Sequence, residues 1–287
     1  GLQQAKEPGM KYGSVCSGVE AATVAWHSLG WQPQWFSEIE KFPSAVLKHH
    51  YPAVPNHGDM TKFKEWNDDR PIDVLVGGTP CQSFSVAGLR KGLDDPRGNL
   101  MLTYLAIAER YAPKWIVWEN VPGVLSSNRG RDFGTFLGAL GQLGYGFAYR
   151  VLDAQYFGVA QRRKRVFVVG YLGDWRRAAA VLFERESLGV SEAKGSEEVA
   201  PCLTAKSGRR FNDGEVIISE GGRPRWSTPI ETERLQGFPD NFTQIPWRDK
   251  AAEGCPDGPR YKAMGNSMAV PVMNWIGRRI QMVEETT

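Results

Sequence analysis

The sequence predicts an α/β protein: a doubly wound, mostly parallel sheet with a second, smaller and loop-rich domain. Over the first 170 residues, short apolar runs alternate with segments that have apolar residues at helical spacing, and this alternation places helices on both faces of a parallel sheet. After about Tyr171 the alternation stops, and Gly, Pro and charged residues cluster up to about Ala263. We therefore expect one domain at 10–170, a small domain at 171–264, and a C-terminal helix at 265–287 that returns to the first domain.

Six segments of the first domain are expected to be strands. Several are apolar nearly throughout, as strands buried on both faces are, and the six cover residues 11–17, 34–39, 73–78, 114–120, 147–153 and 165–172. Helical spacing indicates helices between them at 20–30, 43–51, 100–111 and 132–144. Scattered pieces of the second domain, such as EVIIS at 215–219, resemble strands.

The last predicted helix covers residues 267–284. Its apolar residues recur at helical spacing, and we expect this face to pack on the first domain: Val270, Met273, Ile276 and Ile280.

Composition excludes several classes of protein. The 287 residues are 41% hydrophobic and 23% charged, which is typical of a globular chain and not of a disordered or fibrous one. No apolar run approaches the roughly 20 residues that span a bilayer, and the first residues lack the basic-then-apolar order of a secretion signal. We therefore expect a cytoplasmic protein without a membrane partner. The net charge of +3 does not by itself indicate a nucleic-acid partner.

The four cysteines do not suggest a structural cross-link by disulfides or metal. Cys16, Cys81, Cys202 and Cys255 lie far apart, with no CxxC and no Cys/His spacing that fits a metal. We expect neither a disulfide framework nor a bound metal.

Unusual residues follow four of the predicted strands, where ligands of doubly wound sheets bind. They are CSGVE at 16–20, SEIE at 37–40, GGTPCQS at 77–83 and ENVPG at 119–123. Cys81 follows two glycines, which let the backbone approach a ligand closely. An isolated Cys at a strand end is more often inert core filler than a nucleophile, and a Glu in the position of Glu119 is more often a solvated loop residue. Both interpretations stay open on these residues alone.

Five motifs decide between them: PCQSFS at 80–85, ENV at 119–121, QRRKR at 161–165, RLQGFPD at 234–240 and GNSM at 265–268. In order and spacing they resemble the DNA cytosine-5 methyltransferases of phage and bacterial type, over nearly the whole chain from Tyr12 to Ile280. The resemblance implies the class I S-adenosylmethionine-dependent methyltransferase fold, which is Rossmann-like, with the small domain recognising the target. It also implies methyl transfer from S-adenosylmethionine, with S-adenosylhomocysteine as product, to C5 of a flipped-out cytosine in double-stranded DNA.

The resemblance assigns catalytic roles to four residues. Cytosine C5 is a poor nucleophile until a thiolate adds at C6, and Cys81 is the implied nucleophile. Glu119 is implied to bond N3 and the 4-amino group. Arg165 matches the arginine that contacts the cytosine O2 and orients the glutamate, while Arg163 is expected to support a loop, the thiol or a phosphate.

The implied donor site departs from the family pattern. The first family motif usually resembles DxFxGxGG, whereas the matching stretch here is SVCSGVEAA at 14–22. Gly18 is kept, the leading Asp is absent, and Glu20 and Ala21 stand where two glycines are common. Glu38 is expected to bind the ribose hydroxyls, with Glu40 a competing choice by spacing. The other implied donor residues are Cys16, Ile39, Asp59, Met60, Gly78, Pro80, Asn266 and Met268.

Two further regions are expected to contact DNA. Residues 84–100 have no regular period and resemble the family's mobile loop over the flipped base. Ser85 and Arg97 in this loop, and Gln82 just before it, are candidate DNA contacts. The recognition segment 171–233 is short for the family, which suggests a compact element and a short target site. Its candidate contacts are Arg209, Arg210, Arg223 and Arg225, for each of which a solvated basic surface is an equal alternative.

Three other functions remain alternatives. A tRNA cytosine-5 methyltransferase would carry the same motifs, and a catalytically silent DNA-binding relative would have no chemical need for Cys81, Glu119 and Arg165 together. A nicotinamide dehydrogenase fits the fold, but GxGxxG is missing after the first strand. We expect a monomeric enzyme, associated with the nucleoid of a bacterial or phage-infected cell.

Overall fold

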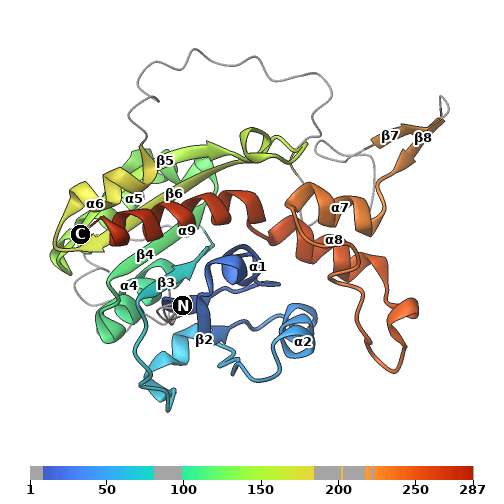
Figure 1. The fold of residues 1–287 in the computed structure, drawn as a ribbon, viewed down its shortest axis with the longest axis horizontal. Coiled ribbons are helices and arrows are strands. Elements are labelled where there is room, and N and C mark those ends of the chain that lie inside the picture. The colour runs from blue at the N-terminus through green and yellow to red at the C-terminus, as the bar shows by residue number, and fades with distance from the viewer. Residues whose placement is uncertain (1–8, 81–98, 184–201, 203–216, 221–222, 287) are drawn as a thin grey trace, which may run out of the picture.

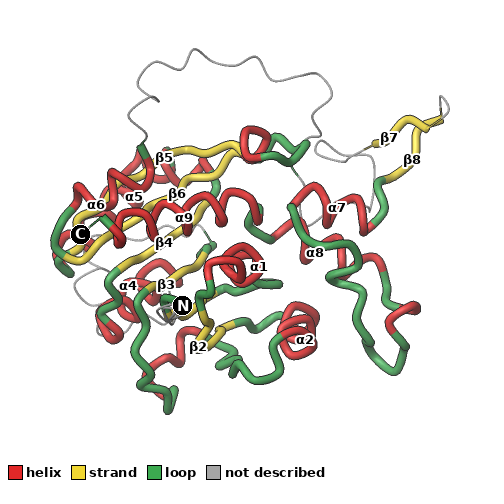
Figure 2. The backbone as a smooth tube through the Cα atoms, viewed as in Figure 1, coloured by secondary structure: helices red, strands yellow, loops and turns green. Residues whose placement is uncertain are grey.

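All six expected strands form one sheet. The computed structural model describes residues 9–80, 99–183, 202, 217–220 and 223–286 (Figure 1). The strand order is β2-β1-β3-β4-β6-β5, and a separate hairpin pairs β7 with β8 (Figure 2). The strands are β1 Lys11–Val15, β2 Gln32–Ser37, β3 Val74–Gly77, β4 Trp115–Asn120, β5 Tyr145–Asp153, β6 Lys164–Leu172, β7 Ile217–Glu220 and β8 Arg223–Trp226.

Every helix expected from the spacing of apolar residues is present. The α-helices are α1 Ala21–Trp26, α2 Lys41–His50, α4 Leu100–Tyr111, α5 Arg131–Gln142, α6 Trp175–Leu182, α7 Pro229–Gln236, α8 Asp257–Asn266 and α9 Val270–Glu285. Short 3₁₀ segments lie between them: η1 His27–Leu29, η2 Met60–Glu65, η4 Pro122–Leu125, η5 Ser127–Gly130, η6 Ala154–Phe157 and η8 Ala252–Gly254. No helix of the described residues is long and apolar enough to cross a bilayer.

The central strands are buried on both faces. Along β3 the side chains alternate: Val74 and Val76 join the core that includes residues of α1, α6 and α9, while Leu75 joins the core that includes residues of α4 and α5. The continuous apolar runs in the sequence therefore reflect a sheet covered by helices on both sides, as a doubly wound fold requires.

One strand of the sheet runs against the others. β1, β2, β3 and β4 are parallel to one another, whereas β6 is antiparallel to both of its neighbours, β4 and β5, so β5 runs in the same direction as β1 to β4. Asn120 at the end of β4 pairs with Val166 near the start of β6. The residues that precede β6 therefore reach the same sheet edge as the residues that follow β1 to β4.

The packing of α6 bears on the division into domains. Residues 171–182 fall in the predicted second domain, yet Ala178, Val181 and Leu182 of α6 are fully buried in the core shared with Ile276 and Ile280 of α9. The expected apolar face of α9 is confirmed, and in Figure 1 this helix lies along the sheet. On this packing we place the junction between the two domains after Leu182, and we keep the division itself as a proposal.

Helices α7 and α8 lie beyond one end of α9, next to the β7-β8 hairpin (Figure 1). A buried ion pair joins them, with Arg260 Nη2 3.1 Å from Glu233 Oε1. The other Glu233 oxygen accepts from the backbone N–H of Asn241 at 2.7 Å. Each hydrogen bond to the Glu233 carboxylate lowers the cost of burying its charge. The ion pair therefore holds α8, and the chain that leads from it into α9, against α7.

Candidate active site

A cavity of about 910 Å³ lies at the carboxyl ends of β1, β2, β3 and β4. It gathers most of the residues expected at the site: Cys16, Gly18, Glu38, Ile39, Asp59, Met60, Gly78, Pro80, Glu119, Arg163, Arg165 and Asn266. Met268 lines a smaller adjoining cavity, whose lining shares Cys16, Gly18, Gly78, Glu119 and Asn266 with the larger one. Residues far apart in the sequence therefore meet in one hollow of the size that takes small-molecule ligands.

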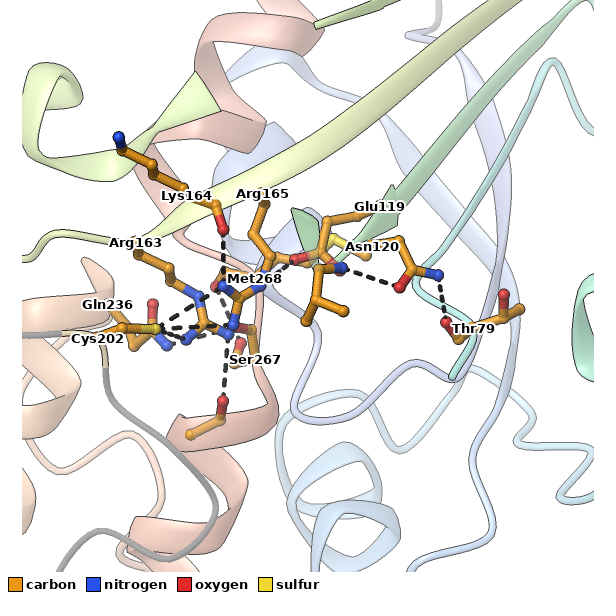
Figure 3. Close-up of polar contacts among 12 residues, drawn as sticks. Thr79, Glu119, Asn120, Arg163, Lys164, Arg165, Cys202, Gln236, Ser267 and Met268 are labelled. Carbon is orange, nitrogen blue, oxygen red and sulfur yellow. Dashed lines mark hydrogen bonds and ion pairs between the residues drawn. The ribbon is translucent and has the colours of Figure 1, made fainter. Parts of the chain in front are cut away.

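Glu119 and Arg165 form an ion pair in this cavity (Figure 3). Glu119 is the last residue but one of β4, Arg165 is the second residue of β6, and the antiparallel pairing brings Arg165 Nε to 3.1 Å from Glu119 Oε1. Burial raises the pKa of the Glu119 carboxyl above its usual range, and the guanidiniums of Arg165 and Arg163 oppose that shift. The carboxyl group is thus held in place by a cation while burial favours its protonated form.

Arg163 holds the chain between α8 and α9. Its Nη2 donates to the carbonyls of Gly265 at 3.1 Å and Ser267 at 2.7 Å, and its own backbone N–H donates to Asp153 Oδ1 at 2.9 Å. Asn266 lies between the two carbonyls. Of the three roles expected for Arg163, these contacts match the support of a loop.

Two side chains of β4 fix the turn that leads to Cys81. Asn120 Nδ2 donates to the Thr79 carbonyl at 2.8 Å, and Trp118 Nε1 donates to Thr79 Oγ1 at 3.0 Å (Figure 3 shows the first). Pro80 follows directly and lines the cavity. The remaining predicted contacts of this region and of the recognition segment lie outside the described residues: Cys81, Gln82, Ser85, Arg97, Arg209 and Arg210.

Glu38 is placed to bind two vicinal hydroxyl groups. Its Oε2 accepts from the Gly18 N–H and its Oε1 from the Glu40 N–H, both at 2.7 Å, so each oxygen is oriented and keeps a lone pair for a ligand. Burial raises the pKa of the Glu38 carboxyl. Glu40 instead forms an exposed ion pair with Lys262, with Oε2 2.8 Å from Nζ. Both acids line the cavity, and Glu38 is the one whose carboxyl group is buried and oriented by the backbone.

The adjacent residues offer an apolar surface and an acceptor. Ile39 is 70% exposed although it lines the cavity, so a ligand that covers it gains apolar contact. Asp59 accepts from the N–H and hydroxyl of Thr61 through one oxygen, Oδ1, at 2.9 and 2.7 Å. These two bonds do not use Asp59 Oδ2, so this oxygen can accept from an amino group of a ligand.

Cys16 lies against Met60, with Sγ 3.5 Å from Sδ. Burial, and next the charge of Glu38, raise the pKa of the Cys16 thiol to about 12. A thiol of that pKa is not a nucleophile at neutral pH, so Cys16 belongs with the ligand-binding surface.

Several residues at the site were not anticipated. Trp247 lines the cavity and packs edge to face on Phe42, with ring centroids 5.2 Å apart. Cys202 Sγ lies 3.3 Å from Arg163 Nη1 and 3.8 Å from Arg165 Nη1. Both residues come from the loop-rich part of the chain, where no periodicity points to them.

Arg225, a candidate DNA contact, forms a bidentate ion pair with Glu231. Its Nη1 and Nη2 lie 2.9 and 2.8 Å from the two carboxylate oxygens, and Glu231 also caps the start of α7 together with Thr228. The pair orients the guanidinium. Its contact with DNA stays a prediction.

We expect Gly78→Ala to lower kcat far more than it lowers thermal stability. A Cβ at this position would lie 2.9 Å from Glu119 Oε2 and 3.3 Å from the Met268 methyl group, and Arg165 prevents the carboxyl group from yielding freely. Because small displacements of catalytic groups reduce rates about 10²-fold, turnover should fall by roughly that factor. Steady-state kinetics and melting curves check it, with Gly134→Ala as the control, where an added Cβ meets open space. Equal kcat in the two variants would contradict the placement of Glu119.

Metal binding finds no support in the described residues, where no group of three or more His, Cys, Asp or Glu side chains is arranged to hold an ion.

Comparison with known proteins identifies the fold and its relatives. The family model of the C-5 cytosine-specific DNA methylases matches residues 10–193 and 191–282. A protein of Escherichia phage P1 named DNA N-6-adenine-methyltransferase is 34% identical over 94% of this chain and 61% of its own length. Type II methyltransferase M.SsoII of Shigella sonnei is 33% identical over 85% of this chain and 72% of its own. M.BsuFI of Bacillus subtilis is 41% identical over 83% and 64%.

Two solved structures share the fold at low sequence identity. The Entamoeba histolytica methyltransferase EhMeth superposes with a TM-score of 0.69 at 16% identity, covering 97% of this chain and 99% of its own. The S. pombe Dnmt2 methyltransferase superposes with a TM-score of 0.70 at 16% identity, covering 96% and 98%. The agreement confirms the predicted class I methyltransferase fold.

Proposed function

Because the chain belongs to the C-5 cytosine-specific DNA methylase family, a family of DNA cytosine-5 methyltransferases, we propose that it methylates C5 of a cytosine held outside the duplex. The observation that carries this proposal is the ion pair of Glu119 and Arg165 on the wall of the cavity that also contains Glu38. Cytosine presents N3 and a 4-amino group on one edge and O2 beside them. A carboxyl group and a guanidinium side by side match this pattern of acceptors and donors.

The residues present fit S-adenosylmethionine as the donor. The two oriented oxygens of Glu38 suit the ribose hydroxyls, exposed Ile39 suits the adenine face, and Asp59 Oδ2 suits the adenine amino group. The cavity of about 910 Å³ has room for such a ligand beside a base. When bound, this donor supplies an electrophilic methyl group.

In the proposed mechanism, the Cys81 thiolate adds to cytosine C6 and forms a carbon–sulfur bond. The electron pair of the C5–C6 double bond moves toward N3, where Glu119 donates a proton, and C5 becomes nucleophilic enough to accept the methyl group. Loss of the C5 hydrogen as a proton, return of the N3 proton to Glu119 and departure of the thiolate restore the ring. Arg165 keeps the Glu119 carboxyl group aimed throughout, because its Nε occupies Oε1.

Access to both faces of the ring requires that the cytosine leave the base stack, at a cost of a few kcal/mol. We propose that the second domain, beyond Leu182, supplies the contacts that offset this cost and read the neighbouring bases. The predicted contacts Arg209, Arg210 and Arg225 belong to it. Arg225 is the one whose side chain the structure describes, held by Glu231 at the start of α7.

Two other acceptors compete with DNA cytosine. The phage P1 relative is named for methylation of adenine at N6, and a tRNA cytosine would use the same residues. We would incubate the protein with isotopically labelled S-adenosylmethionine and either duplex DNA or total tRNA, then identify the labelled nucleoside by mass spectrometry. Labelled 5-methyldeoxycytidine is the expected product. Labelled N6-methyldeoxyadenosine, or label confined to tRNA, would overturn the proposal.

Glu38→Ala should weaken binding of S-adenosylmethionine by about tenfold or more, since hydrogen bonds to a charged acceptor contribute about 1.5–3 kcal/mol each. Isothermal titration calorimetry measures the dissociation constant. Glu40→Ala is the matched control, because Glu40 is the next acid along the chain but pairs with Lys262 on the surface. A Glu40→Ala variant that binds as weakly as Glu38→Ala would reverse the assignment.

A further inference from the structure

A buried carboxyl group lies at the foot of the loop between β1 and α1. Glu20 is 1% exposed. Its Oε1 accepts from the Ser14 hydroxyl, and its Oε2 accepts from the N–H and hydroxyl of Thr23 at 3.2 and 2.6 Å. The Tyr12 hydroxyl in turn donates to Thr23 Oγ1 at 2.8 Å. Every hydrogen bond in this network points toward the carboxyl group, which ties the strand before the loop to the helix after it.

The network stands where the sequence departs from the DxFxGxGG pattern. That pattern has an acid at the position of Ser14 and a glycine at the position of Glu20. Here the acid and the small residue have changed places, and the two side chains are bonded to each other. The carboxyl group therefore enters this network from the C-terminal end of the loop.

The backbone of the loop explains why a fixed network is needed. Cys16, Gly18 and Glu20 have φ of +49°, +56° and +64°, a region that is unfavourable for residues with a side chain. Such a conformation persists when its surroundings hold it in place. Burial raises the pKa of the Glu20 carboxyl to about 7, so a negative charge is costly at this position. The three hydrogen bonds that the carboxyl group accepts compensate for that cost.

The loop delivers two groups to the donor cavity. The Gly18 N–H reaches Glu38 Oε2 at 2.7 Å, and Cys16 lines the wall beside Met60. Glu20 itself lines the smaller adjoining cavity and does not line the larger one. Because its side chain is buried and both of its oxygens bond to Ser14 or Thr23, we infer that it acts on the donor through the shape of residues 16–20.

We propose that Glu20 is a positioning residue of the donor site, whose carboxyl group, relocated from position 14 to position 20, holds the loop of residues 16–20 in its donor-binding shape. The identity of the donor as S-adenosylmethionine rests on the function proposed above. The positioning of the loop can be measured without any ligand.

Three variants separate the carboxyl group from the backbone. Glu20→Gly removes the carboxyl group but suits the left-handed backbone, so a defect in this variant reports the lost network and not added strain. Ser14→Asp places two carboxyl groups in contact, which is unfavourable. The double variant Ser14→Asp/Glu20→Gly restores one carboxyl group at the position that the family pattern uses.

We expect Glu20→Gly to raise the dissociation constant for S-adenosylmethionine about 10- to 100-fold in calorimetry, and the double variant to return it to within about threefold of the natural chain. In the unliganded protein, amide hydrogen exchange at residues 16–24 should be faster in Glu20→Gly and slow again in the double variant. Glu20→Gly that binds the donor normally, or a double variant no better than Glu20→Gly, overturns the proposal.

Asp174→Gly is the control, because Asp174 also caps a helix of this domain, accepting from the Arg176 N–H at 2.9 Å. It should lower the melting temperature without changing donor binding. A natural chain that binds no S-adenosylmethionine would refute the proposed function, whereas the exchange rates would still decide the role of Glu20. Equal exchange at residues 16–24 in the natural chain, Glu20→Gly and the double variant would refute that role independently.

Discussion

Replacing Glu119 by glutamine should lower kcat for cytosine methylation by about 10²- to 10⁴-fold, the range that general acid catalysis contributes. The amide keeps the size of the side chain and a hydrogen bond to the base, but it cannot supply a proton to N3 as electron density moves there. The dissociation constants for donor and DNA should change much less than kcat, because the group acts on charge that develops only in the transition state.

The pH profile gives this prediction a second measurement. Burial raises the pKa of the Glu119 carboxyl, so its protonated form persists to a higher pH than in an ordinary glutamate. A step that needs this proton should therefore slow as the pH rises through the raised pKa, and Glu119→Gln should lose that alkaline limb. Glu284→Gln is the control, since Glu284 pairs with Lys114 and Arg177 near the end of α9 and does not line the cavity. A Glu119→Gln variant with the profile and kcat of the natural chain would refute proton donation.

The strands and helices of the sheet were predictable because each carries a strong local signal. The helix expected at 100–111 is observed as Leu100–Tyr111, and its apolar residues are buried on a sheet whose strands are apolar in sequence. The strand ends were informative for the same reason: in a doubly wound fold, polar residues after an apolar strand come together at one edge.

The direction of β6 was not predictable from these signals. The apolar pattern of a buried strand does not depend on the direction in which the strand runs. The alternation of strands and helices therefore predicted a mostly parallel sheet, but it did not show that β6 is antiparallel to β4. That reversal is what places Arg165 beside Glu119. The sequence resemblance paired the two residues, and the topology gives the physical reason.

Two other features depend on tertiary contacts that no short pattern records. Helix α6 has eight residues, five of them Ala or Arg, and its membership in the sheet domain is visible only from the burial of Val181 and Leu182 against α9. The exchange of acid and small residue between positions 14 and 20 was visible as a departure from a motif. Its structural role became clear only from the hydrogen bond between the Ser14 and Glu20 side chains, which the left-handed backbone of the loop brings together.

A duplex with 5-fluorocytosine at the target position should trap the protein covalently, and Cys81→Ser should abolish the trap completely. The proposed cycle ends with loss of the C5 hydrogen as a proton, and fluorine cannot leave as a cation. The bond between Cys81 and C6 should therefore survive denaturing electrophoresis after the methyl group has been transferred. A serine hydroxyl is a far weaker nucleophile near neutral pH, so no adduct should form.

Two other cysteines make this test specific. Cys16→Ser should still form the adduct, because burial raises the pKa of the Cys16 thiol to about 12 and it lies against Met60 on the donor side. Cys202→Ser is the decisive arm, since Cys202 Sγ lies 3.3 Å from Arg163 Nη1, and a neighbouring guanidinium favours a thiolate. The adduct should persist in Cys202→Ser. An adduct that persists in Cys81→Ser and disappears in Cys202→Ser would identify Cys202 as the nucleophile instead.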